Sequence, residues 1–125
     1  MKLGITAGAY SGWEDNSEGL KRMKEHGYSF MDYNLLANTD KHPAYQCDEE
    51  EFVKILTATR KKINGAGIEI SQTHGPWRWP PQDLEEADRA ERFEKMSKAI
   101  VATKILGTKY FVIHPIMPFG WDKDP

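Results

Sequence analysis

Three stretches of the chain place apolar residues three or four positions apart, which is the spacing of one face of an α-helix. The first opens near Asn16 or Ser17, the second begins near Asp48, and the third covers about 83–106. We therefore expect three amphipathic helices. The residues predicted for their buried faces are Leu20 and Met23; Phe52, Ile55, Leu56, Thr59 and Ile63; and Leu84, Ala87, Ala99, Ile100, Thr103 and Leu106.

Three glycines, Gly27, Gly67 and Gly107, stand 40 residues apart, each between a helical stretch and a strand-like one. Gly27 is expected to end the first helix as a left-handed cap. After each glycine the pattern changes to short runs rich in β-branched and aromatic residues, which are typical of strands. With a similar run at the amino terminus, four strands are predicted. They cover Lys2 to Ala7, Tyr28 to Leu36, Ile68 to His74 and Lys109 to His114.

Strands separated by helices of this length cannot form hairpins, so they are expected to pair in parallel through right-handed crossovers. A doubly wound sheet and a barrel both accept this alternating order. We favour the barrel because no G-x-G-x-x-G motif follows the first strand, and because the three later strands end in polar residues at one level. The prediction is an α/β chain whose parallel β/α units form the first half of a TIM (β/α)₈ barrel. Residues 1–125 would be a single N-terminal half-barrel, truncated after its fourth strand.

Counting seven residues from each repeat glycine reaches Asn34, His74 and His114, at the carboxyl ends of successive strands. In a (β/α)₈ barrel this end carries the active site, and residues at equal height converge on the axis. Two imidazoles there are suited to binding a metal, to hydrogen-bonding sugar hydroxyls or to moving a proton near pH 7. A histidine at a strand end is often only a hydrogen-bonded rim residue, but the shared register favours a functional role.

The loop that follows His74 presents two indoles and a guanidinium, those of Trp77, Trp79 and Arg78. Sugars stack on aromatic faces, and arginine suits phosphate or carboxylate groups. Trp13, after the first strand, adds an aromatic side chain to the same rim. The alternative is that these side chains cover exposed core. We predict a ligand-facing role for at least one residue of this loop.

Other polar and apolar features receive structural interpretations. Asp32 lies two residues before Asn34, so an inward carboxylate there requires a basic or hydrogen-bonding partner, and structural pairing is expected. His26 and His42 are predicted to be surface residues, and the single cysteine, Cys47, to be inert. The apolar loop 115–121 is equally suited to a pocket wall and to a subunit contact.

Composition limits the partners. The formal net charge is −2 with both signs interspersed, so there is no positive field for a nucleic acid. No stretch approaches the roughly 20 apolar residues that cross a membrane, and no signal peptide is evident, so a cytoplasmic location is expected. The hydrophobic fraction of 39% is low for a parallel sheet buried on both faces.

The segments from Ile68 to Pro76 and from Leu106 to Pro115 resemble the xylose isomerase-like TIM barrel superfamily, and the resemblance extends over essentially the whole chain. That superfamily includes sugar phosphate isomerases and epimerases and the apurinic-site endonucleases. In sugar-processing members the resemblance implies that His74 and His114 sit beside a small sugar or sugar phosphate. In the endonuclease branch it implies that such histidines bind zinc.

The same resemblance implies a divalent metal (Mn, Zn, Co or Mg) for the complete barrel, with ligands on strands five to eight, which this sequence lacks. No acid or base is assigned here, and the chain alone is expected to be inactive as a sugar isomerase or epimerase. Two unpaired parallel edges invite association, either with a complementing C-terminal half or with a second copy. A homodimerising, non-catalytic half-barrel is therefore one alternative. An endonuclease-like zinc phosphodiesterase is another, disfavoured by the acidic balance.

Overall fold

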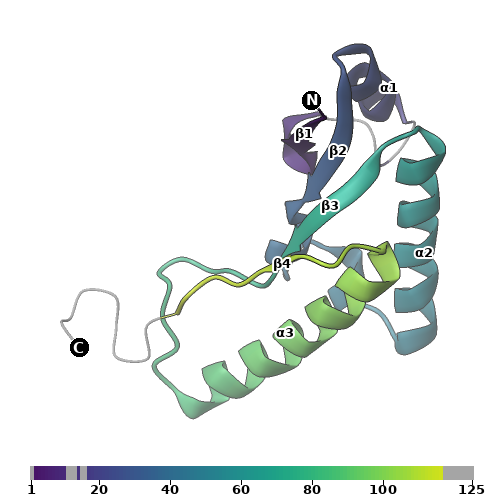
Figure 1. Ribbon diagram of the computed structural model, residues 1–125. Coiled ribbons are helices and arrows are strands. Elements are labelled where there is room, and N and C mark those ends of the chain that lie inside the picture. Colours follow the sequence, from purple (N-terminus) through teal and green to yellow (C-terminus); the bar gives the residue numbers. More distant parts are fainter. Residues whose placement is uncertain (1, 11–13, 15–16, 117–125) are drawn as a thin grey trace.

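Four parallel strands alternate with three α-helices along the chain (Figure 1). The structure, a computed structural model, describes residues 2–10, 14 and 17–116. The strands lie in the order β1-β2-β3-β4, and each neighbouring pair is parallel, which is half of a TIM-barrel-like arrangement, as predicted. The strands are β1 (Leu3–Thr6), β2 (Tyr28–Tyr33), β3 (Glu69–His74) and β4 (Phe111–Val112). The helices are α1 (Glu18–Glu25), α2 (Glu49–Gly65) and α3 (Glu86–Leu106), with three short 3₁₀ turns, η1 (Ala7–Ala9), η2 (Asn34–Ala37) and η3 (Pro43–Tyr45).

The three repeat glycines share one backbone role. Gly27, Gly67 and Gly107 have φ angles of 86°, 73° and 85°, in the left-handed region that glycine adopts without strain. Each reverses the chain between a helix and the next strand. The 40-residue spacing therefore reflects one β/α turn repeated three times, and the predicted left-handed cap at Gly27 is confirmed.

All four strands are shorter than predicted, β1 by one residue at each end, β3 by one residue at its start, and β2 and β4 by more. β2 ends at Tyr33 instead of Leu36, because the backbone leaves the extended region there (φ −84°, ψ 77°) and Asn34 opens η2. β4 is limited to Phe111 and Val112, which pair with Thr73 and His74 of β3. His114 consequently lies just beyond the ladder.

The third helix corrects the sequence prediction at its start and along its face. α3 begins at Glu86 rather than 83, with a capping box between Glu85 and Asp88. Leu84 and Ile100, both predicted to be buried, are each 52% exposed. Ala99, Ala102, Thr103 and Leu106 carry the buried stripe, and Ile100 is one position off this 3.6-residue period.

The second helix has an N-cap at Asp48, where the sequence pattern predicts its start. The Asp48 carboxylate accepts a hydrogen bond from the Glu51 amide at 2.9 Å. The Glu51 carboxylate accepts from Lys54 at 3.0 Å. The helix thus starts where the sequence indicates, with a simple N-cap.

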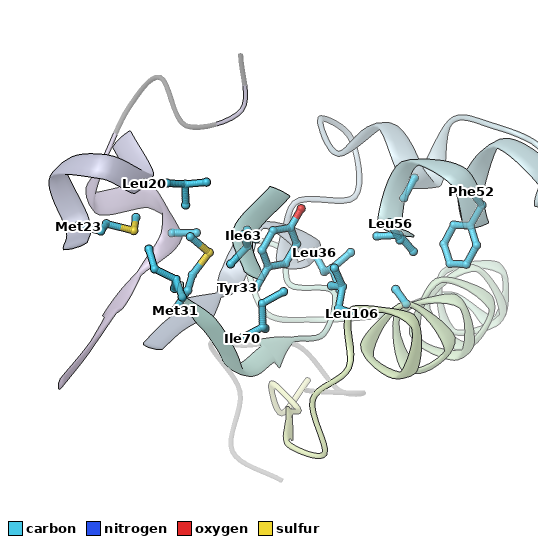
Figure 2. Packing of buried hydrophobic residues seen from close by; sticks show 14 residues of the cluster. Leu20, Met23, Met31, Tyr33, Leu36, Phe52, Leu56, Ile63, Ile70 and Leu106 are labelled. Carbon is cyan, nitrogen blue, oxygen red and sulfur yellow. The ribbon is translucent and has the colours of Figure 1, made fainter. Parts of the chain in front are cut away.

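The buried apolar side chains form one cluster on the helix side of the sheet (Figure 2). Met31 and Tyr33 of β2 and Ile70 of β3 enter this cluster. Asp32, which alternates with Met31 and Tyr33, is 25% exposed. In β3 the pairing with β2 shifts register after Ile70, so His74 alternates with the buried Thr73 and is 21% exposed. Successive side chains of a strand point to opposite faces, so the polar set lies on the face away from the helices. A sheet with one apolar face explains the modest hydrophobic content.

His42 is a buried residue, and its prediction as a surface residue is wrong. It is 7% exposed, its Nε2 lies 2.8 Å from the Tyr33 hydroxyl, and its Nδ1 accepts from the Ala44 amide at 3.2 Å. Burial lowers its pKa to about 4. Its buried environment arises because η2 and η3 fold the long loop back onto α2, which local sequence does not reveal. His26 is exposed, as predicted.

Candidate functional site

His74 and His114 lie side by side at the carboxyl end of the sheet. His74 Nδ1 lies 3.3 Å from His114 Nε2, and the two ring centroids are 5.3 Å apart. β3 ends at His74, which pairs with Val112, and His114 follows two residues later, so adjacent parallel strands bring the two rings together. The convergence expected from the glycine register is therefore present for this pair.

A carboxylate extends the pair to a line of three groups. Asp32 Oδ2 lies 3.1 Å from His74 Nε2, which gives Asp32 the pairing partner that the sequence predicts for it. We refer to Asp32, His74 and His114 as the histidine line. It crosses the ends of β2, β3 and β4, and its members are only partly buried. A ligand at this edge would therefore meet them directly.

When no metal is bound and both imidazoles are neutral, the hydrogen-bond partners determine which ring nitrogens carry hydrogen. Asp32 only accepts, so His74 Nε2 carries a hydrogen and His74 Nδ1 is the acceptor. His114 Nε2 must then donate to His74, which leaves His114 Nδ1 as an acceptor. A proton taken up at His114 Nδ1 can be passed from His114 Nε2 to His74, beside the Asp32 carboxylate. Burial lowers the pKa of His114 below its usual value, and neighbouring His74 lowers it further.

Unpaired oxygen atoms gather at the same edge. Within the described ranges, Thr6 Oγ1, Asp32 Oδ1 and Asn34 Oδ1 are buried side-chain atoms without a hydrogen-bond partner in the protein. Thr6 ends β1 and stands opposite Asp32 in the β1–β2 ladder, and Asn34 directly follows β2. A buried acceptor left without a donor costs about 1–3 kcal/mol, so these atoms favour a ligand that brings hydroxyl or amine hydrogens.

The loop of residues 75–81, here the tryptophan loop, forms one side of the edge. The Trp77 ring meets His114 edge-on at 6.5 Å between centroids, and Trp79 lies 6.2 Å from Trp77. Trp77 and Trp79 are 46% and 63% exposed, so aromatic surface is available beside the histidines. Arg78 turns to the carboxylates of Asp83 and Asp88 instead of presenting a guanidinium to the edge. Trp13 and residues 117–121 of the second apolar loop lie outside the described residues.

The histidine pair also fits part of a metal site. Two nitrogens bound tetrahedrally to one zinc ion at about 2.0–2.1 Å lie roughly 3.3–3.4 Å apart, the spacing found between His74 and His114. Asp32 on the far nitrogen of His74 matches the carboxylate that commonly orients a ligating histidine. Among the residues described, no group of three or more His, Cys, Asp or Glu completes such a set. The pair fits a metal only if other ligands are supplied from elsewhere.

One comparison with known proteins supports the fold. No family model matches the sequence, and no curated protein matches it. The structure is similar to that of a sugar phosphate isomerase/epimerase from Parabacteroides distasonis, with a TM-score of 0.59 and 19% sequence identity. The match covers 93% of this chain and 39% of that one, so this chain spans about two fifths of the length of that protein. The likeness shows a shared fold. No helix in the ranges that the structure describes is long and apolar enough to cross a membrane.

Proposed function

We propose that the carboxyl edge of this sheet binds the hydroxyl groups of a small sugar or sugar phosphate, as one half of an isomerase or epimerase site. The observation that carries the proposal is the histidine line, with the unpaired Asp32 and Asn34 oxygens beside it. A polyol supplies hydrogen-bond donors for these oxygens, and the apolar C–H face of a sugar ring can stack on the exposed Trp77 ring. Similarity to a sugar phosphate isomerase/epimerase supports the same class.

In this proposal the residues of the chain bind, orient and hold protons. One sugar hydroxyl donates to His114 Nδ1. Asp32 Oδ1 and Asn34 Oδ1 are buried in the free protein and accept further hydroxyls once the side chains that cover them move. Aldose–ketose isomerisation and epimerisation move protons beside a carbonyl. A proton that leaves a sugar hydroxyl would be taken up by His114 Nδ1, and His114 Nε2 would then pass a proton to His74. No described residue is assigned to remove the carbon-bound proton. The chain alone is therefore expected to bind without turnover.

A divalent metal belongs to the proposal for a complete barrel. His74 Nδ1 and His114 Nε2 would hold it together with ligands from outside the residues that the structure describes. When bound, the metal would polarise a carbonyl or hydroxyl oxygen. A zinc phosphodiesterase is the less favoured use of the same pair, because the cations beside the tryptophan loop, Arg78, Arg92 and Lys95, already face carboxylates.

Calorimetric titration with a panel of pentoses, hexoses and their phosphates, in chelator, tests the proposal. We expect one class to bind the wild-type chain, and His114→Ala to weaken that binding about tenfold through the lost hydrogen bond and ring contact. His26→Ala is the matched control, because His26 is exposed and precedes the amino end of β2, opposite the site. Absence of binding by every sugar, or equal weakening by both substitutions, would contradict the proposal.

A second candidate follows from the sheet edges. Within the described residues, β1 pairs with β2 and β4 with β3, and each keeps one edge open. Leu3 and Ile113, at these edges, are 44% and 63% exposed. Two copies that paired β4 with β1 would close an eight-stranded barrel without a catalytic role. Light scattering coupled to gel filtration decides: twice the 14.3 kDa of one chain supports this dimer, and 14.3 kDa contradicts it.

A further inference from the structure

Asp83 is a buried carboxylate at the base of the tryptophan loop. It is 3% exposed and lies between this loop and α3. Arg92 donates to it from two atoms, Nε at 2.5 Å and Nη2 at 3.1 Å, and Arg78 donates to the same carboxylate. Burial alone would raise the pKa of Asp83, but the hydrogen bonds from Arg92 and Arg78 outweigh it and hold the pKa below its usual value. Asp83 therefore remains charged and fixes the plane of the Arg92 guanidinium.

Arg92 uses its remaining nitrogen on the loop backbone. Its Nη1 donates to the Pro76 carbonyl at 3.3 Å. The amide on the other side of that peptide bond, the amide of Trp77, donates to the Ala37 carbonyl at 3.0 Å. Both polar groups of the peptide that leads into Trp77 are thus tied, one to α3 and one to the end of η2.

This peptide sets the place of the aromatic wall. Trp77 meets His114 edge-on, and the contact depends on the position of the Trp77 backbone, because Trp77 is 46% exposed and its ring is not enclosed on all sides. An arginine without its carboxylate partner would keep its charge but lose its fixed orientation, since the side chain has many rotamers. The Pro76 carbonyl would then lose its donor.

We propose that Asp83 is a positioning residue that holds Trp77 against His114 by aiming Arg92 at the Pro76 carbonyl. The inference rests on the proposed function only in calling this aromatic wall part of a sugar site. Asp83 also occupies Arg78 and Arg92, so the loop offers aromatic surface to a ligand without offering these cations to a phosphate. This part of the edge therefore favours the hydroxyl-bearing body of a sugar.

Amide hydrogen exchange followed by NMR tests the inference without any ligand. In Asp83→Asn we expect exchange of the Trp77 amide to accelerate at least about tenfold, because its peptide is freed on the Arg92 side. The Gly75 amide, which donates to Val112 at 2.8 Å in the same loop, serves as the internal reference and is expected to keep its rate. Asp40→Asn is the matched control, because Asp40 lines the same crevice as Trp77 and Arg92 but faces Lys95.

Arg92→Lys is the second variant if Asp83→Asn does not fold. Lysine retains the positive charge but lacks the planar guanidinium that donates to Asp83 and Pro76 at once, so the same selective acceleration at Trp77 is expected. An unchanged Trp77 rate, or Trp77 and Gly75 accelerating together, would overturn the proposal. Selective acceleration in a chain that binds no sugar would support the role of Asp83 while contradicting the proposed function, so the two failures are distinguishable.

Discussion

His74 Nε2 lies 3.1 Å from Asp32 Oδ2, although 42 residues separate them in the chain. The contact joins the carboxyl ends of β2 and β3, and His114 continues it to the end of β4. Because Asp32 accepts from His74 Nε2, His74 Nδ1 is the acceptor. Asp32 thus orients the ring, and His74 Nδ1 can receive a proton from His114.

Replacing His74 by Gln is expected to raise the pKa of His114 towards its usual value. Burial remains as the larger cause of the lowered pKa, but the repulsion from His74 is removed. An NMR pH titration of the His114 ring in chelator measures the change, with His26→Gln as the control that leaves it unaltered. A His114 pKa that stayed constant or fell in His74→Gln would show that the two rings do not interact as described.

Acid should destabilise the fold through His42. Its folded-state pKa of about 4 lies below the usual 6.5, so between these values the unfolded chain binds the proton that the folded chain rejects. Stability linked to His42 is fully present above pH 6.5, falls as the pH drops towards 4, and changes no further below that. The loss by pH 4.5 is about 2–3 kcal/mol for such a shift.

Urea denaturation at pH 7 and pH 4.5 measures this effect. His42→Asn keeps an acceptor for the Ala44 amide and removes the titrating imidazole. Its loss of stability between pH 7 and pH 4.5 should therefore be smaller than that of the wild type by about 2–3 kcal/mol. If wild type and His42→Asn lost stability equally between the two pH values, His42 would not carry the effect.

Gly75→Ala is expected to disturb the join between the tryptophan loop and β4. A Cβ atom at Gly75 would lie 2.7 Å from Phe111 Cζ and 2.9 Å from Met96 Sδ, so both side chains must move, at a cost of about 1–3 kcal/mol. Gly65→Ala, at the last position of α2, meets nothing within 4 Å and should be neutral or stabilising. Thermal unfolding of both variants provides the comparison, and equal midpoints would refute the packing argument.

The buried hydroxyls of Thr73 in β3 and Thr103 in α3 form a hydrogen bond whose donor can be identified by mutation. Thr103 donates to the Ala99 carbonyl, so Thr73 must donate to Thr103 across the 2.7 Å between their Oγ1 atoms. Thr103→Val leaves the Thr73 hydroxyl unpaired and should cost about 1–3 kcal/mol, more than Thr73→Val. In the double variant the loss should be smaller than the sum of the two single losses. Additive losses in urea denaturation would contradict the hydrogen bond, and a larger loss in Thr73→Val than in Thr103→Val would contradict its direction.

The order of elements and the strand-end histidines could be predicted because they depend on local signals. Glycine marks each left-handed turn, and a fixed distance from it reaches His74 and His114. Asn34 shares the register, yet it lies in η2, because the chain turns at Tyr33 and nothing in the residue pattern marks that turn.

The remaining features depend on contacts between distant segments. The sequence pattern places Asp83 at the start of a helix, but three contacts from Arg78 and Arg92 make it the anchor of the tryptophan loop. His42 is buried because η3 folds onto α2. For Asp83 the only sequence signal is an acidic residue near two arginines, at positions 78 and 92, which is common on solvated surfaces.

The most direct test of the sugar-binding edge is ¹⁵N NMR of the four imidazole rings in chelator, with and without a saturating sugar from the binding panel. Without sugar, we expect His74 to carry its hydrogen on Nε2 and His114 on Nε2. With sugar, His114 Nδ1 should shift as it accepts a hydroxyl hydrogen, His74 should respond through the shared bond, and His26 and His42 should stay unchanged. Rings at positions 74 and 114 that ignore every sugar, or a response confined to His26 or His42, would contradict the account.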